Sequence, residues 1–345
     1  MTERTEGARR YEVVVIGGGA AGLSGAMALA RSRRSVLVVD AGRPRNAPAG
    51  HIHNYLGREG MPPEELLARG RAEVEGYGGE IVPGEVAAVE RLDGGGFRVA
   101  LADGTRVAAD RLLVATGLAD ELPEVPGLAE RWGRDVLHCP YCHGYEVRDQ
   151  AIGILNTGPM TAHQVLLWRQ LSADLTVFQH TGPEPSAEER EQYAARGVTL
   201  VEGEVARLEV TGDRLTGAVL ADGRVVRCQA LVVAPRFTAR GGVLAGLGLR
   251  PTQQERDGHV IGEYIAADPT GATEVPGVWV AGNVASVTEQ LVGAVTAGLR
   301  AGAMINGDLA AEETRRAVAA RRAGFSARDE SELTEQVLGD RRHGL

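Results

Sequence analysis

The first forty residues alternate between apolar runs and a glycine-rich break. Residues 11–16 form a short, β-branched apolar run of the kind that a strand buried on both faces shows. A glycine-rich turn follows at 17–22, and a mostly apolar stretch continues to about Arg31. A second β-branched run, 35–39, ends in Asp40. This order predicts a strand, a turn, a helix and a second strand.

The same kind of pattern returns later in the chain. Residues 99–117 and 218–236 align without gaps, and each predicts a strand, an Asp-Gly turn, a return strand and an apolar strand that enters a loop. A second strand, helix and strand are expected at 151–155, 160–171 and 175–179. The repetition predicts an α/β fold of two nucleotide-binding domains with a common design.

Length and charge agree with this expectation and exclude several functions. The chain has 345 residues, enough for two domains, and a formal net charge of −9. That charge argues against a nucleic-acid partner, which needs a clustered positive surface. All 37 basic residues are arginine, so lysine Schiff-base chemistry and the lysine-containing phosphate loop are excluded.

One N-terminal segment has a second interpretation. Arg9 and Arg10 precede eighteen uncharged residues, 13–30, so an export signal or a short membrane span is an alternative. The five glycines in this segment favour a strand, a turn and a helix instead. We therefore expect a cytoplasmic protein with no membrane partner.

The glycine-rich turn has the spacing of a dinucleotide-binding site. Gly17 permits the tight turn, Gly19 admits a pyrophosphate, and Gly22 lets the helix and strand pack closely. The first helical N–H groups are then free to bind phosphate. Asp40, at the end of the second strand, is placed to accept hydrogen bonds from a ribose. The motif consists of Gly17, Gly18, Gly19, Ala20, Ala21 and Gly22.

The second copy has lost these features. Asn156 stands where the first copy has Gly17, and Thr161 stands where it has Gly22. Pro235-Arg236 replaces Thr116-Gly117, and no ribose-binding carboxylate follows the second strand. We expect a domain kept for its shape, and the alternative is a variant turn that still binds a nicotinamide nucleotide.

A cysteine pair lies between the two copies. The spacing of Cys139 and Cys142 lets two thiols form a reducible disulfide, and Pro140 predicts a helix that begins beside Cys139. His143 is a candidate base for thiols, and His138 is a second candidate. A c-type haem attachment site, a zinc site and an inert pair remain alternatives. Cys228 is expected to be a small packing residue.

These motifs together resemble the low-molecular-weight thioredoxin reductase family over residues 10 to 312. The matched pieces are IGGGAAG at 16–22, VATG at 114–117, the C-x-x-C and GVWVAGNV at 277–284. The resemblance implies a fold of two Rossmann-like, three-layer ββα domains and FAD as the cofactor. Asn283 replaces the aspartate of the family pattern, which keeps an acceptor for the ribityl chain. Besides the glycine turn and Asp40, the implied FAD-binding residues are Ala115, Thr116, Gly117, Gly282, Asn283, Gln290 and Leu291.

The sequence CPYCHGYE departs from the reductases, which carry an aspartate at the position of His143. It is similar to the flavin-dependent dithiol oxidases that close the disulfides of gliotoxin and holomycin. His51 matches a flavin-proximal histidine of that subgroup. The resemblance implies that a small-molecule dithiol attacks Cys139, that Cys142 passes the electrons to FAD, and that O2 accepts them to give H2O2. A NAD(P)H-dependent reductase and a non-catalytic flavin redox sensor are the alternatives.

The resemblance also implies a homodimer and a discontinuous flavin domain. We expect the flavin domain at 1–119 and 240–312, and the nicotinamide-like domain with the C-x-x-C at 120–239. Residues 313–345 extend beyond the resemblance. They are expected to form a charged, solvated helical tail, with a lid or dimer arm as the alternative.

Overall fold

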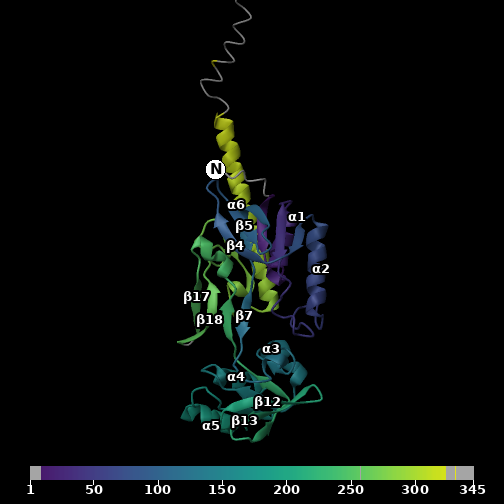
Figure 1. The fold of residues 1–345 in the computed structure, drawn as a ribbon, viewed down its shortest axis with the longest axis vertical. Helices are drawn as coiled ribbons and strands as arrows, with labels where there is room; N and C mark the ends of the chain where they lie inside the picture. Colours follow the sequence, from purple (N-terminus) through teal and green to yellow (C-terminus); the bar gives the residue numbers. More distant parts are fainter. Residues whose placement is uncertain (1–8, 257, 324–330, 332–345) are drawn as a thin grey trace, which may run out of the picture.

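The computed structural model describes residues 9–256, 258–323 and 331. Two α/β units follow each other along the long axis of the molecule, and the backbone passes between them twice (Figure 1). We call the unit that contains the N-terminal βαβ segment the first unit and the other the second unit. The predicted fold class, a thioredoxin reductase-type arrangement of two Rossmann-like units, is confirmed.

The first unit is built on a seven-stranded sheet in the order β3-β2-β1-β6-β5-β4, with β19 paired to β6. Strands β1, β2, β3, β6 and β19 are parallel, and β4 and β5 form an antiparallel meander with β6. Val13, Val14 and Val15 of β1 are fully buried, as the apolar run predicts. The strands are β1 Arg10–Ile16, β2 Val36–Asp40, β3 Glu80–Pro83, β4 Val86–Arg91, β5 Phe97–Leu101, β6 Arg106–Val114 and β19 Val278–Val280.

In the described part of this unit, α1 packs against both α2 and α6 (Figure 1). They are α1 Ala20–Arg31, α2 Pro63–Gly76 and α6 Leu291–Ala323. Short 3-10 helices lie at Gly242–Leu247 (η3) and Gly282–Val284 (η4). The α6 helix is continuous across residue 313, so the first part of the expected tail is the end of this helix. Ion pairs of Arg34 with Glu313 and of Arg111 with Glu312 hold it against the sheet. The expected tail lies outside the described residues at 324–330 and 332–345.

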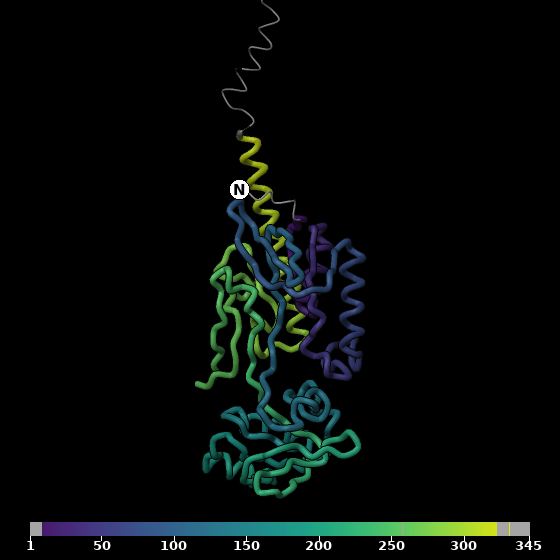
Figure 2. The backbone as a smooth tube through the Cα atoms, in the orientation of Figure 1, coloured from purple at the N-terminus to yellow at the C-terminus, as the bar shows by residue number. Residues whose placement is uncertain are grey.

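A four-stranded sheet, β17-β18-β16-β7, carries both connections to the second unit. The chain leaves the first unit through β7 and returns through β16, and these two strands pair antiparallel (Figure 2). The strands are β7 Leu118–Glu121, β16 Arg236–Ala239, β17 Pro251–Arg256 and β18 His259–Ile265. The boundaries expected at 119/120 and 239/240 fall at this pair and remain predictions.

The second unit repeats the design with a parallel sheet in the order β11-β10-β9-β15-β8 and a separate sheet of β12, β13 and β14. The parallel strands are β8 Val136–Leu137, β9 Ile152–Leu155, β10 Leu175–Phe178, β11 Thr199–Val201 and β15 Ala230–Val232. The others are β12 Val205–Thr211, β13 Arg214–Leu220 and β14 Val225–Arg227. The helices are η1 Ala129–Arg131, α3 Pro140–His143, η2 Tyr145–Val147, α4 Thr161–Trp168 and α5 Ala187–Ala195.

The two copies of the repeat differ in one respect that their sequences did not predict. In the first copy the return strand and the apolar strand are a single strand, β6, whereas in the second copy they are separate strands, β14 and β15. Ala108 of β6 pairs with β5 on one side and with β1 on the other, which keeps the strand continuous. Strand β9 begins beside Ala230, so no parallel partner supports β14.

Candidate functional site

The turn between β1 and α1 has the shape that the glycine motif predicts. Gly17 has a φ of +105°, a conformation that favours glycine. A Cβ atom on Gly22 would lie 1.9 Å from the carbonyl oxygen of Gly17, so this position admits no side chain. The N–H of Gly18 donates to Asp40 Oδ1 at 3.2 Å, which holds the carboxylate at the turn.

This turn fits the pyrophosphate of a dinucleotide. A Cβ atom on Gly19 would meet nothing within 4 Å, so open space lies in front of the turn. Helix α1 has no side-chain cap at its N-terminus and no acidic residue in its first turn. Its first N–H groups and its positive dipole end are therefore available to an anion.

Replacing Gly22 by alanine is expected to remove most of the bound flavin. The added Cβ collides with the backbone of Gly17, so the turn must open. The measurement is the ratio of flavin to protein absorbance after purification. Gly158→Ala is the matched control, because a Cβ on this glycine of the second turn meets nothing within 4 Å. A Gly22→Ala protein with full flavin content would contradict this role of the turn.

One cavity of about 820 Å³ joins almost all of the residues singled out by sequence. It reaches from the glycine turn past the C-terminal end of β6 to the cysteine pair. Gly22 is absent from its lining, because it packs against the turn from behind. The sequence-predicted residues that line it are Gly17, Gly18, Gly19, Ala20, Asp40, His51, Ala115, Thr116, Gly117, Cys139, Cys142, His143, Gly282, Asn283, Gln290 and Leu291.

Asn283 is held by protein groups on both sides of its amide. Its Nδ2 donates to the carbonyl oxygens of Ser286 and Glu289, at 3.0 and 2.9 Å. Its Oδ1 accepts from Arg45 Nη1 at 3.2 Å, so a ribityl hydroxyl would have to share this acceptor. An aspartate could not donate to the two carbonyls, which gives the asparagine a role in shaping the loop before α6.

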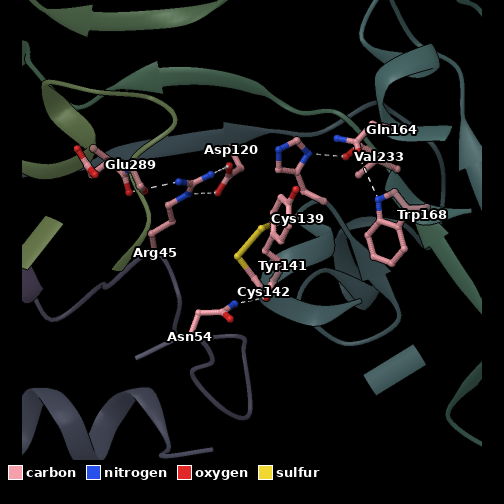
Figure 3. Close-up of a disulfide and its surroundings, with 12 residues drawn as sticks. Arg45, Asn54, Asp120, Cys139, Tyr141, Cys142, Gln164, Trp168, Val233 and Glu289 are labelled. Atoms are coloured by element: carbon pink, nitrogen blue, oxygen red, sulfur yellow. Dashed lines mark hydrogen bonds and ion pairs between the residues drawn. A yellow bond between two sulfur atoms is a disulfide. The ribbon is translucent and has the colours of Figure 1, made fainter. Parts of the chain in front are cut away.

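Arg45 and Asp120 form a bidentate ion pair that the sequence did not reveal. Arg45 Nε and Nη2 contact the two carboxylate oxygens of Asp120 at 2.8 and 2.6 Å (Figure 3). The Asp120 side chain is 8% exposed, and Arg45 also lies over the Phe237 ring. Because Asp120 lies on β7, this pair ties the loop after β2 to the connection between the units.

Cys139 and Cys142 form a disulfide, with their Cα atoms 5.3 Å apart. Cys139 is the N-cap of α3, and Pro140 is the first residue of that short helix, as predicted. Tyr141 lies between the cysteines, and its carbonyl oxygen accepts a hydrogen bond from Asn54 Nδ2 at 2.5 Å (Figure 3). The disulfide therefore lies against the first unit and faces the large cavity.

His143 and His138 differ in their suitability as a base. Burial lowers the pKa of His143, nearby Glu146 raises it to a smaller extent, and His53 lowers it. Its imidazole is partly buried, lines the cavity and makes no hydrogen bond to the described residues. A neutral imidazole at that place can accept a thiol proton.

The imidazole of His138 contacts Val233 and Phe237. Its Nδ1 lies 3.0 Å from the carbonyl oxygen of Val233, so Nδ1 carries the hydrogen of this bond. Its ring meets Phe237 edge-on, and burial lowers its pKa. His138 also lines the large cavity, but its Nδ1 is committed to the Val233 carbonyl oxygen, so His143 stays the first candidate for the base and His138 the second.

The turn of the second unit is held by hydrogen bonds of its own side chains, and Gly158 in this turn lines the large cavity. Asn156 is 2% exposed, its Nδ2 donates to the Pro183 carbonyl oxygen at 2.8 Å, and its Oδ1 accepts from Thr161 Oγ1 at 2.9 Å. Gln179 Nε2 also donates to Pro183. These contacts occupy space at the carboxyl ends of β9 and β10, where a Rossmann-like fold binds its nucleotide.

The third cysteine of the chain, Cys228, is also placed by the structure. Cys228 is fully buried, and burial raises its pKa to about 12, so it is a packing residue as expected.

Among the described residues, no group of three or more His, Cys, Asp or Glu side chains could hold a metal ion. No helix in the described part of the chain is long and apolar enough to cross a membrane.

Comparisons with known proteins agree with this geometry. A family model described as pyridine nucleotide-disulphide oxidoreductase matches residues 11–298. Thioredoxin reductase sirT of Leptosphaeria maculans is 30% identical over 312 residues, which cover 86% of this chain and 93% of that protein. Thioredoxin reductase tcpT of Claviceps purpurea is 29% identical over 311 residues, which cover 87% and 95%.

Solved structures extend the likeness. The crystal structure of HlmI is 44% identical, with a TM-score of 0.84, and the match covers 94% of this chain and 99% of that one. An oxidoreductase from Agrobacterium tumefaciens is 36% identical, with a TM-score of 0.80 and coverage of 87% and 98%. The chain therefore belongs to the pyridine nucleotide-disulphide oxidoreductase family, as a thioredoxin reductase-like oxidoreductase.

Proposed function

We propose that this protein is an FAD-dependent oxidase that converts a small-molecule dithiol into an intramolecular disulfide. The observation that carries the proposal is a cysteine pair that opens on the same cavity as an intact dinucleotide turn, while in the turn of the second unit Asn156 and Thr161 replace two motif glycines and hydrogen-bond to each other. The glycine spacing and Asp40 of the first turn support a bound cofactor. The second turn has Asn156 and Thr161 in place of two motif glycines and no ribose-binding carboxylate after β10, which argues against a reducing nucleotide there. Electrons would therefore enter from a thiol substrate.

In the proposed reaction the chain supplies a base and an exchangeable disulfide. His143 takes the proton of one substrate thiol, and the resulting thiolate bonds to the sulfur of Cys139 as the Cys139–Cys142 bond breaks. The second substrate thiolate then attacks the mixed disulfide, which releases the cyclic product and leaves both cysteines reduced. Bound FAD would accept the two electrons of the cysteine pair and pass them to O2, giving H2O2.

The cofactor contacts are assigned by position in the cavity. The glycine turn and the start of α1 would hold the pyrophosphate, and Asp40 would accept from the adenosine ribose. Asn283 and the N-terminus of α6, near Gln290 and Leu291, would lie at the other end of the cofactor. His51 is exposed beside the cavity and forms no hydrogen bond that places it on the cofactor, so its role stays a prediction.

The implied homodimer also stays a prediction. Val292 and Leu299 are large apolar side chains exposed on α6, seven residues apart and so on one face of the helix. They offer a surface that a second copy could cover.

The experiment that tests the proposal compares two electron donors under anaerobic conditions. Dithiothreitol is expected to bleach the visible flavin absorbance quickly in a stopped-flow instrument, and NADPH is expected to bleach it slowly and without saturation. Sustained H2O2 formation with the dithiol in air would then exclude a sensor that does not turn over. Fast, saturable bleaching by NADPH would instead establish a reductase, the activity in the names of the relatives tcpT and sirT.

A further inference from the structure

A second cavity, of about 420 Å³, lies behind the candidate base. The two cavities adjoin, and His143 and His53 are among the residues that line both of them. The disulfide faces only the first cavity, and Glu146 and Arg134 line only the second. Its lining residues are Pro48, Gly50, His51, His53, Gly133, Arg134, Leu137, His143, Glu146 and Val147.

His53 connects this cavity to two carboxylates. Its Nδ1 lies 2.6 Å from Glu59 Oε1, and its Nε2 lies 3.5 Å from Glu146 Oε1. The other oxygen of Glu59 accepts from the N–H of Asn54 at 2.9 Å, which fixes the loop that carries the histidine. The His53 side chain is only 17% exposed, whereas those of Glu59 and Glu146 are 65% and 42% exposed. His53, Glu59 and Glu146 thus extend from the second cavity to the solvent.

The proposed reaction needs such a route because it uses one base twice. A dithiol and the enzyme disulfide give a cyclic disulfide, two cysteine thiolates and two protons. His143 can hold one proton at a time, so the first must leave, to the released Cys142 thiolate or towards water, before His143 can deprotonate the second substrate thiol. A substrate bound to Cys139 as a mixed disulfide would occupy the first cavity beside His143, which favours proton release on the other side of the imidazole.

We propose that the second cavity, with Glu146, His53 and Glu59, is the route by which protons leave His143 during the oxidation of a dithiol. The inference rests on the proposed function. Glu146 is three residues after His143 and faces the same cavity, so it is placed to receive the first proton, directly or through water in the cavity. His53 then passes a proton between two carboxylates, taking it at one ring nitrogen and releasing it at the other.

Several charged groups face this route, and two of them shift the pKa of His143 in opposite directions. The Glu146 carboxylate raises the pKa of His143, and the His53 imidazole lowers it. A purely electrostatic role for the two residues therefore predicts opposite shifts of the pH profile when each is neutralised. The titratable and charged groups around the route are His51, His53, Glu59, Arg134, His143 and Glu146.

The test measures the rate of flavin bleaching by dithiothreitol against pH, in the holoenzyme and in three variants. At high pH His143 is neutral in every protein, so electrostatic shifts no longer affect the plateau rate. We expect Glu146→Gln and His53→Gln to lower this plateau by about tenfold or more, less than the loss of the base itself would. Added imidazole is expected to restore part of the plateau in His53→Ala, because the cavity can admit it.

The controls separate this inference from the proposed function. Glu184→Gln removes an exposed carboxylate of the second unit that pairs with Arg190, and it is expected to keep the wild-type profile. Flavin content and melting temperature show that each variant is folded. If the wild type is not bleached by the dithiol at all, the proposed function fails and this inference with it. If the wild type is bleached and both Gln variants keep its plateau, only the proton route is overturned.

Discussion

Cys142→Ser is expected to abolish turnover and to trap substrate on the enzyme. In this variant Cys139 can still form a mixed disulfide once an oxidised thiol supplies the bond, but no second cysteine thiolate is present to pass electrons onward. The expected result is a stable adduct on Cys139, seen by mass spectrometry as an increase equal to the substrate thiol. Dioxygen consumption should fall to the background of the free cofactor.

Cys139→Ser is expected to give a different signature. The remaining Cys142 thiolate would lie next to oxidised flavin and produce a long-wavelength charge-transfer absorbance. If this absorbance appears in the Cys142→Ser protein instead, the two roles are reversed.

The third cysteine supplies a matched control. Cys228 is fully buried with its pKa raised to about 12, and the corresponding position of the first repeat copy is Ala109. Cys228→Ala should therefore keep both turnover and spectrum, since the same fold already accepts alanine there. A loss of turnover in this variant would mean that the effects of cysteine removal report stability rather than electron transfer.

The parts of the site that the sequence predicted are those set by local geometry. The glycine turn follows from neighbours in the chain, because Gly22 must pack against Gly17 and Asp40 must follow the next buried strand. The cysteine pair and its proline likewise determine a short helix without help from distant residues. These features can be predicted from the spacing of residues along the chain.

The parts that the sequence did not predict depend on contacts between distant segments. Arg45 meets Asp120 across 75 residues, and His53 meets Glu146 across more than 90. Neither pair has a characteristic spacing, and each residue alone resembles an ordinary surface charge. The loop after β2 had been assigned only His51, whereas the structure shows that Arg45, His53 and Asn54 make the contacts to the rest of the site.

His143→Ala is expected to lower turnover by about 10²–10⁴-fold, the range for loss of an acid–base group. The direction in which the pKa of His143 is shifted also determines how the rate of reduction depends on pH. Burial disfavours the imidazolium, so the pKa of His143 lies below the ordinary histidine value of about 6.5. The rate of reduction by a dithiol should therefore rise with pH through a limb on the acid side of that value, as His143 loses its proton and becomes able to accept one. This limb should disappear in His143→Ala.

The other buried histidine near the disulfide tests the assignment of that limb. His138→Gln keeps a donor for the Val233 carbonyl oxygen, and we expect the limb to persist, because His138 is held by that bond and does not accept thiol protons. Flavin content should be unchanged in both variants, which separates loss of the base from loss of the cofactor. Full activity in His143→Ala would contradict the assignment, as would stoichiometric zinc or haem in the purified protein. Loss of the limb in His138→Gln alone would move the base to His138, because the pH dependence follows whichever imidazole receives the proton.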